Sequence, residues 1–306
     1  MPCLISCIIY RMKRIATLLL IALIASIMLV ACNNATYSPT STPTSTIISS
    51  TSTPTEAPMA LKVNGDGITL VEYQADLVRL QKAQSDLSET ATPEQQRDQV
   101  IQNFTDQLLL EQAAQKGGYS VDDATVQARV DALATSLGGA DKLASWETTN
   151  GYTDDSFKIS LKREIYADWQ RDQIINSVPE TADQVHALQI LVQDLANANS
   201  LLAQLKSGAD FATLASTLDP TTGGDLGWFP QGYLTQPNVE AAAFALQPGQ
   251  YSDVIKSDLG YHIIYVVERD ANHPLSVDAR RTLQEKTLNN WLQTQKAADQ
   301  IQVLVN

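Results

Sequence analysis

The pattern of apolar residues changes twice along this chain, and the order of these changes restricts how the chain can fold. Apolar residues recur at helical spacing over residues 70–178, alternate as in strands between Val185 and Arg269, and return to helical spacing after Pro274. A single amphipathic helix cannot bury its apolar face alone. The C-terminal helix must therefore pack on the earlier helices, which predicts a discontinuous helical domain with a strand-containing domain inserted into it.

Start and stop signals divide the helical regions. Thr69 with Glu72, and Thr92 with Gln95, have the spacing of a capping box, and Pro93 suits the first turn of a helix. Before these signals, alternating apolar residues around 64–67 predict a short strand and turn. The apolar stripes, interpreted as core-facing surfaces, are Tyr73, Leu77 and Leu80; Val100, Ile101, Phe104, Leu108 and Leu109; Val126, Val130, Leu133 and Leu137; Phe157, Leu161, Ile165 and Trp169; and Leu283, Leu288, Trp291, Leu292 and Ile301.

The beginning of the chain has the composition of an export signal. Two basic residues precede a nearly unbroken apolar run from Ile15 to Val30, which is short for a membrane-spanning helix. The run ends in Leu-Val-Ala-Cys, which resembles a bacterial lipobox. Residues 1–31 are therefore predicted to be a lipoprotein signal peptide, with Cys32 as the site of lipid attachment. The alternative is an uncleaved signal anchor, and Met12 is the better start of the leader.

Residues 32–58 are rich in Thr, Ser and Pro and contain almost no large apolar side chain. Such a composition cannot bury a core and predicts a flexible tether. Removal of residues 1–31, which carry three basic residues and no acid, changes the formal charge from −13 to −16 and leaves Cys32 as the one cysteine. This acidity disfavours nucleic acid as a partner, and a lone cysteine excludes a disulfide framework and a cysteine-based metal site.

The strand-patterned block carries the most specific motifs. Its order is VHALQILV, an amphipathic helix, GADFATLAS, GGDLGWFPQG, FALQPGQYSDVI and LGYHIIYVVERD. This order and spacing resemble the parvulin family of peptidyl-prolyl cis–trans isomerases. The resemblance implies an FKBP-like α+β domain with an antiparallel sheet at residues 180–271. The surrounding all-α chaperone-like domain is expected at 59–179 and is completed by 275–306. This layout resembles secreted foldases and periplasmic chaperones that join a helical body to parvulin domains.

The same resemblance implies which residues form the site. It places His262 and Gln189 behind the proline slot, and Gln189 stands where the family usually has histidine. Glutamine has a donor and an acceptor but cannot titrate, so a hydrogen bond to His262 can survive. Asp219 matches a catalytic position beside the substrate carbonyl, with an Asp-Pro turn as the alternative. The substrate-binding positions implied are Leu226, Leu234, Val239 and Ser257.

Strand alternation adds a prediction about the histidines. The residues on both sides of His262 are apolar, so this side chain should be buried and both ring nitrogens should have partners. His186 lies three residues before Gln189 and should point to the opposite face of the sheet. The residue-based alternative for His262 is a structural histidine tied to the backbone.

These features together predict a lipid-anchored, extracytoplasmic foldase of the bacterial cell membrane. Its parvulin isomerase and helical chaperone body would act on unfolded or nascent secreted polypeptides that contain Xaa-Pro bonds, without a cofactor or metal and without nucleic acid. One alternative is a non-catalytic holdase that uses a degenerate parvulin module as a peptide clamp, because Gln189 and a smaller slot lining depart from the family. A more distant alternative is a structural envelope lipoprotein.

Replacing Cys32 with alanine removes the sulfur that a lipid would modify. We expect Cys32→Ala to move the protein from the membrane fraction to the soluble fraction, as measured by fractionation and immunoblotting of bacteria that express the full chain. Cys7→Ala, within the leader, is the matched control and should leave membrane retention unchanged. Retention of the Cys32→Ala protein would contradict lipid attachment at this position.

Overall fold

The computed structural model describes residues 57–305, so the leader, most of the tether and Cys32 lie outside the described residues. The described part is mixed α+β, which confirms the predicted fold class. None of its helices is long and apolar enough to cross a membrane. In chain order the elements are β1 (Met59–Val63), β2 (Asp66–Thr69), α2 (Leu70–Asp86), α3 (Pro93–Lys116), α4 (Asp123–Leu137), α5 (Ala140–Thr149), α6 (Asp154–Asn176), β3 (Thr181–Val192), α7 (Leu195–Lys206), α8 (Phe211–Leu218), β4 (Asp225–Pro230), α9 (Pro237–Ala245), β5 (Ile255–Ser257), β6 (Gly260–Pro274), α10 (Val277–Ala298) and β7 (Ile301–Val303).

Capping side chains fix the starts of the first two long helices. At α3 the predicted capping box is present: Gln95 N–H donates to Thr92 Oγ1 at 3.2 Å, and Thr92 N–H donates to Gln95 Oε1 at 2.8 Å. At α2 only half of the box forms, because Glu72 N–H donates to Thr69 Oγ1 while the Glu72 carboxylate accepts from Arg163. A guanidinium is a stronger partner for a carboxylate than a neutral backbone N–H.

Arg163 connects three helices within the helical region. This α6 residue is 6% exposed, and its guanidinium lies 2.6 Å from Glu72 Oε1 on α2 and 3.6 Å from Glu111 Oε2 on α3. Burial raises the pKa of Glu111, and the attraction of Arg163 lowers it by less. The buried cation therefore holds α2, α3 and α6 together through carboxylates that would lose their counter-charge without it.

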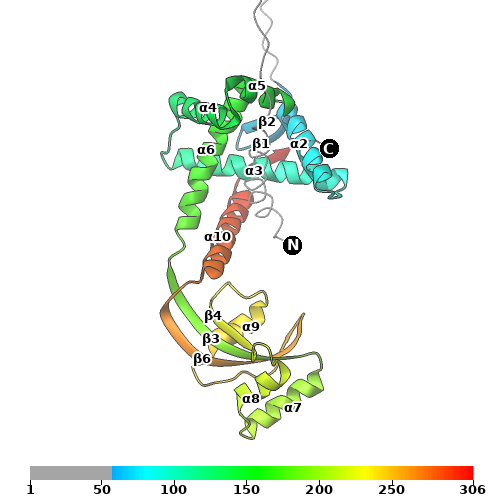
Figure 1. Ribbon diagram of the computed structural model, residues 1–306, viewed down its shortest axis with the longest axis vertical. Coiled ribbons are helices and arrows are strands. Elements are labelled where there is room, and N and C mark those ends of the chain that lie inside the picture. The colour runs from blue at the N-terminus through cyan, green and yellow to red at the C-terminus, as the bar shows by residue number, and fades with distance from the viewer. Residues whose placement is uncertain (1–56, 306) are drawn as a thin grey trace, which may run out of the picture. The chain divides into compact units, whose positions relative to one another are not determined.

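The first and last strands share one small sheet, with the order β2-β1-β7. β1 and β2 form the predicted strand and turn, with Val63 opposite Asp66. β7 pairs with the other edge of β1, where Leu61 faces Val303 and Val63 faces Ile301. Figure 1 shows β7 in red beside β1. Segments from the two ends of the described chain therefore complete one structural unit.

The prediction that the last helix extends to Ile301 is wrong. α10 ends at Ala298, Asp299 is extended, and Ile301 belongs to β7. The β-branched side chains of Ile301 and Val303 favour strands, and β1 offers them backbone partners that lie far away in the sequence.

The helical part of α10 packs on earlier helices. Leu292 is buried in a cluster with residues of α3 and α6, and Trp291 packs against this cluster. Lys296 Nζ lies 2.5 Å from Asp106 Oδ1 on α3, so an ion pair supports the same contact. The apolar face of the C-terminal helix is therefore covered by helices that precede the strand-patterned block.

The second sheet contains four antiparallel strands in the order β4-β3-β6-β5. β3 and β6 pair along their whole length, from Thr181 opposite Pro274 to Val192 opposite Tyr261. Helices α7 and α8 cover one face and α9 covers the other (Figure 1). We call the core under α9 the α9 cluster; it consists of Val185, Ala187, Phe229, Val239, Ala243, Phe244, Ile264 and Val266.

Removing the Arg163 guanidinium should show how much its ion pairs with α2 and α3 contribute to the free energy of unfolding. We expect Arg163→Met to lower the free energy of unfolding by about 3 kcal/mol, because two partly buried carboxylates lose their counter-charge. Arg129→Met, on the exposed side of α4, is the matched control and should change stability by less than about 0.5 kcal/mol. Urea unfolding followed by circular dichroism measures both changes, and equal stabilities would contradict the bridging role.

Candidate functional site

His262 lies in the middle of the four-stranded sheet, on β6. Its side chain is 2% exposed, which confirms the burial predicted from strand alternation. Ile264 and Val266 follow it on the same face and belong to the α9 cluster, whereas Ile263 faces α7 and α8. Helices on both faces of the sheet therefore bury the central residues 262–264 of this strand and remove the imidazole from bulk water.

Both ring nitrogens of His262 have side-chain partners. Nδ1 lies 3.2 Å from Gln189 Oε1, and Nε2 lies 2.7 Å from Ser257 Oγ. Because the amide oxygen can only accept, Nδ1 carries the proton and Nε2 accepts from the Ser257 hydroxyl. Ser257 Oγ in turn accepts from Leu259 N–H at 3.0 Å. Burial lowers the pKa of His262, which favours this neutral form.

The three partners come from three adjacent strands. Gln189 is on β3, His262 on β6 and Ser257 on β5, and they are diagonal neighbours in the register of these strands. The sequence resemblance placed Ser257 among the substrate-binding positions and did not connect it to His262. The tight β5–β6 hairpin, in which Ser257 pairs with Gly260, is the signal that could have indicated this bond.

A turn at residues 219–224 is attached to the backbone of Gln189. Gln189 N–H donates to Gly224 O at 2.8 Å. Gly224 has φ +72°, and a Cβ atom there would lie 2.1 Å from Gln189 O, so only glycine allows this approach. The turn therefore fixes β3 at the position where the site needs the Gln189 side chain.

The Asp219 carboxylate binds within this turn. Its Oδ1 accepts from the backbone N–H groups of Thr221 and Thr222, each at 3.1 Å, and Oδ2 accepts from the Thr222 hydroxyl. The bonds from Thr222 are the main reason why the pKa of Asp219 is lowered. Within residues 57–305, no hydrogen bond joins Asp219 to His262 or Gln189. These bonds fit the Asp-Pro turn that the sequence left open beside a catalytic role.

The predicted slot residues gather against the α9 cluster. Val239 is 2% exposed and belongs to this cluster, while Leu226 and Leu234 are half-buried and pack against it. They come from α9, β4 and the loop between these elements. Their apolar surface lies on the sheet face that also carries His262 and Gln189, because both of these residues alternate with cluster members.

The edge of β3 that pairs with β4 carries aromatic contacts that the sequence did not predict. His186 pairs in register with Trp228, and its Nε2 lies 2.8 Å from Asp225 Oδ1. The Trp228 ring stacks on His273, with centroids 4.1 Å apart and an interplanar angle of 13°. His186 lies on the face opposite Gln189, as predicted. The cross-strand register of β3 and β4 was the missing signal for these contacts.

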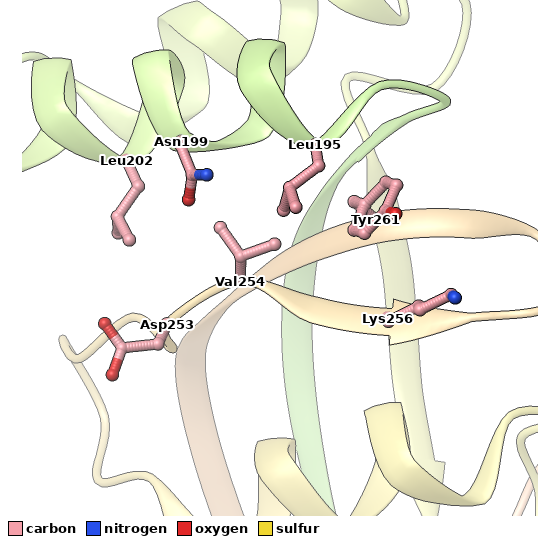
Figure 2. A pocket seen from close by; sticks show the side chains of 7 residues that line it. All are labelled: Leu195, Asn199, Leu202, Asp253, Val254, Lys256 and Tyr261. Atoms are coloured by element: carbon pink, nitrogen blue, oxygen red, sulfur yellow. The ribbon is translucent and has the colours of Figure 1, made fainter.

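A cavity of about 620 Å³ lies on the other side of the sheet. Figure 2 shows that side chains of α7 face those of the segment around β5 across it. Tyr261 lines the cavity, and its neighbour His262 points the other way along the strand. The cavity lining is Leu195, Asn199, Leu202, Asp253, Val254, Lys256 and Tyr261, so it contains none of the predicted site residues.

Comparisons with known proteins match both parts of the chain. Residues 173–270 match the PPIC-type PPIASE domain, and residues 9–144 match the SurA-like N-terminal domain. The chain is 34% identical over 126 residues to foldase protein PrsA of Geobacillus sp. (strain WCH70), covering 40% of this chain and 45% of that protein. A crystal structure of PrsA from Bacillus anthracis shares 30% identity and covers 62% of this chain and 97% of that chain, with a TM-score of 0.40.

A second relative matches over a longer stretch. The chain is 30% identical over 226 residues to foldase protein PrsA of Caldanaerobacter subterraneus subsp. tengcongensis, covering 66% of this chain and 71% of that protein. It spans 39–62% of the length of several other curated relatives. The combination of an isomerase-type domain, a SurA-like region and this long alignment shows that the chain belongs to the PrsA family of foldase proteins.

Proposed function

We propose that this chain is an extracytoplasmic foldase that accelerates cis–trans isomerisation of Xaa-Pro bonds in unfolded or nascent secreted polypeptides. The observation that carries the proposal is the buried His262, bonded to Gln189 and Ser257 on the sheet face that bears the α9 cluster. The PPIC-type domain match and the PrsA relatives support the same activity.

The reaction requires a site that favours a twisted amide. Rotation about a peptide bond faces a barrier of about 18–20 kcal/mol, because the planar amide is stabilised by resonance. An enzyme lowers this barrier by binding the twisted form more tightly than either planar form. In this proposal Leu226 and Leu234, which are half-buried and pack against the α9 cluster, hold the proline ring. Their apolar side chains keep water from the amide, and no covalent bond is formed or broken.

His262 acts in this proposal by positioning polar groups. Its neutral ring fixes the Gln189 amide through Oε1 and orients the Ser257 hydroxyl, so both side chains have defined directions beside the slot. With Oε1 engaged, the remaining donors of Gln189 are on its Nε2. Asp219 contributes through the turn that holds Gly224 against the Gln189 backbone.

The helical segments would form the chaperone part of the molecule. We assign residues 59–179 and 275–306 to one body, with the parvulin domain at 180–271 inserted into it. The packing of α10 on α3 and α6 and the pairing of β7 with β1 support this assignment. Lipid on Cys32 would anchor the body to the outer side of the bacterial membrane, and residues 32–58 would serve as the tether.

An isomerisation assay tests the catalytic claim. The purified full chain should accelerate the cis-to-trans reaction of several Xaa-Pro peptides in a protease-coupled assay. We expect Gln189→His, which restores the residue that the family usually has at this position, to raise kcat/KM by about three- to tenfold, the value of about one hydrogen bond. Gln127→His, on exposed α4, is the matched control and should leave kcat/KM unchanged.

The assay also separates an enzyme from a holdase. Rates equal to the uncatalysed reaction for every peptide, for both the natural chain and Gln189→His, would overturn the isomerase proposal. Suppression of client aggregation by the same preparation would then indicate a peptide-holding protein. Light scattering of a chemically denatured client, diluted with and without the full chain, measures this second activity.

The buried imidazole should make stability depend on pH. Because burial moves the pKa of His262 below its ordinary value of 6.5, the unfolded chain takes up this proton first as pH falls. The neutral ring therefore contributes stability that is present above pH 6.5 and is lost as pH falls from there toward the folded-state pKa. Urea unfolding at several pH values between 7.5 and about 5.5 gives the free energy of unfolding as a function of pH. This free energy should fall less steeply with falling pH for His262→Asn than for the natural chain. Equal slopes would contradict a buried neutral imidazole.

A further inference from the structure

The loop between β4 and α9 carries Leu234, one of the residues assigned above to the proline slot. It consists of residues 231–236 and carries Tyr233 and Leu234, which both pack against the α9 cluster. A loop of this kind has backbone groups that regular structure does not satisfy. The position of Leu234, and with it the shape of the slot, therefore depends on what holds this loop.

One carboxylate holds the loop from the inner side. Glu240 Oε1 accepts from Gly232 N–H at 2.7 Å, and Glu240 Oε2 accepts from Leu234 N–H at 2.8 Å. Both bonds are charge-assisted and short, so they are among the stronger hydrogen bonds a loop can make. Glu240 lies in the first turn of α9, where the helix dipole also favours a negative charge. Its neighbour Val239 is a predicted slot residue and lies in the α9 cluster, so one helical turn supplies both a predicted slot residue and the loop anchor.

The outer side of the same loop contacts α10. Lys286 Nζ donates to Gly232 O, and a Cβ atom at Gly232 would lie 3.2 Å from Leu283 Cδ2. Gly232 has φ +86°, a backbone conformation that residues other than glycine adopt only with strain. Gly232 is thus bonded through its N–H to α9 and through its carbonyl to the C-terminal helix.

We propose that Glu240 is a positioning residue for the proline slot, and that Lys286 couples the slot loop to the C-terminal helix. This inference rests on the proposed isomerase function and extends it to two residues outside the predicted site. The loop touches the proline ring in the planar and twisted forms alike. Loss of the Glu240 bonds that position the loop should therefore weaken substrate binding and raise KM, while kcat changes little.

The first test replaces the carboxylate with an amide of the same shape. Gln at 240 has one acceptor oxygen, and its NH2 group would face a backbone donor. In the full chain we expect Glu240→Gln to raise KM for Xaa-Pro peptides about tenfold with kcat within about twofold, the effect of losing one charge-assisted bond. Glu268→Gln, exposed on β6, is the matched control. A fall in kcat with KM unchanged would overturn the positioning role.

Amide exchange gives a readout that does not need catalysis. The N–H groups of Gly232 and Leu234 should exchange at least about tenfold faster in Glu240→Gln, because exchange follows the local opening equilibrium. Peptide affinity measured by calorimetry should fall by the same factor as KM rises. If the natural chain proves inactive, the isomerase proposal fails, while these two measurements still decide the role of Glu240. Unchanged exchange at both amides would overturn it.

The second test addresses the contact with α10. Lys286→Gln should raise KM about threefold, and its effect should be smaller when Glu240→Gln is already present, because both changes release one loop. Lys142→Gln, exposed on α5, is the matched control and should leave KM unchanged. Full additivity of the two changes, or no effect of Lys286→Gln alone, would overturn the coupling to the C-terminal helix.

Discussion

The antiparallel pairing of β3 with β6 is the interaction on which the rest of the structure depends. This ladder brings Gln189 beside His262, although the two residues are distant in sequence. It also lets the chain leave the helical region at α6 and return to it at α10. Because side chains alternate along both strands, the same ladder supplies apolar surface to α7 and α8 on one face and to α9 on the other.

Much of this arrangement could be predicted from local sequence. Helical periodicity, the Thr92 cap and the β1–β2 turn depend on residues that are close in sequence, so the residue pattern predicts them. Burial of His262 followed from apolar residues on both sides of it, and the bond to Gln189 followed from the donor and acceptor that glutamine retains. The family motifs lie within one short stretch of sequence. They therefore predicted the fold of this domain, although they did not predict its detailed contacts.

The features that local sequence does not predict share a different physical cause. Ile301 forms a strand because β1 offers it partners, and nothing near Ile301 in the sequence reveals them. The Glu240 carboxylate reaches two backbone donors of a loop, and backbone donors have no sequence signature. Asp219 could serve a turn or a substrate, and only the bonds to Thr221 and Thr222 show the turn. Long-range partners and main-chain contacts are what residue patterns cannot encode.

The sharing of one sheet by β1 and β7 sets an order for assembly. A chain that emerges from its N-terminus presents β1 and β2 early, whereas β7 appears after every other described element. Until then, one edge of β1 lacks the partners that Gln300 and Leu304 later provide to Asn64 and Ala60. Contacts of such long sequence separation close slowly. The helical part of this chain thus has a late-closing step in its own folding.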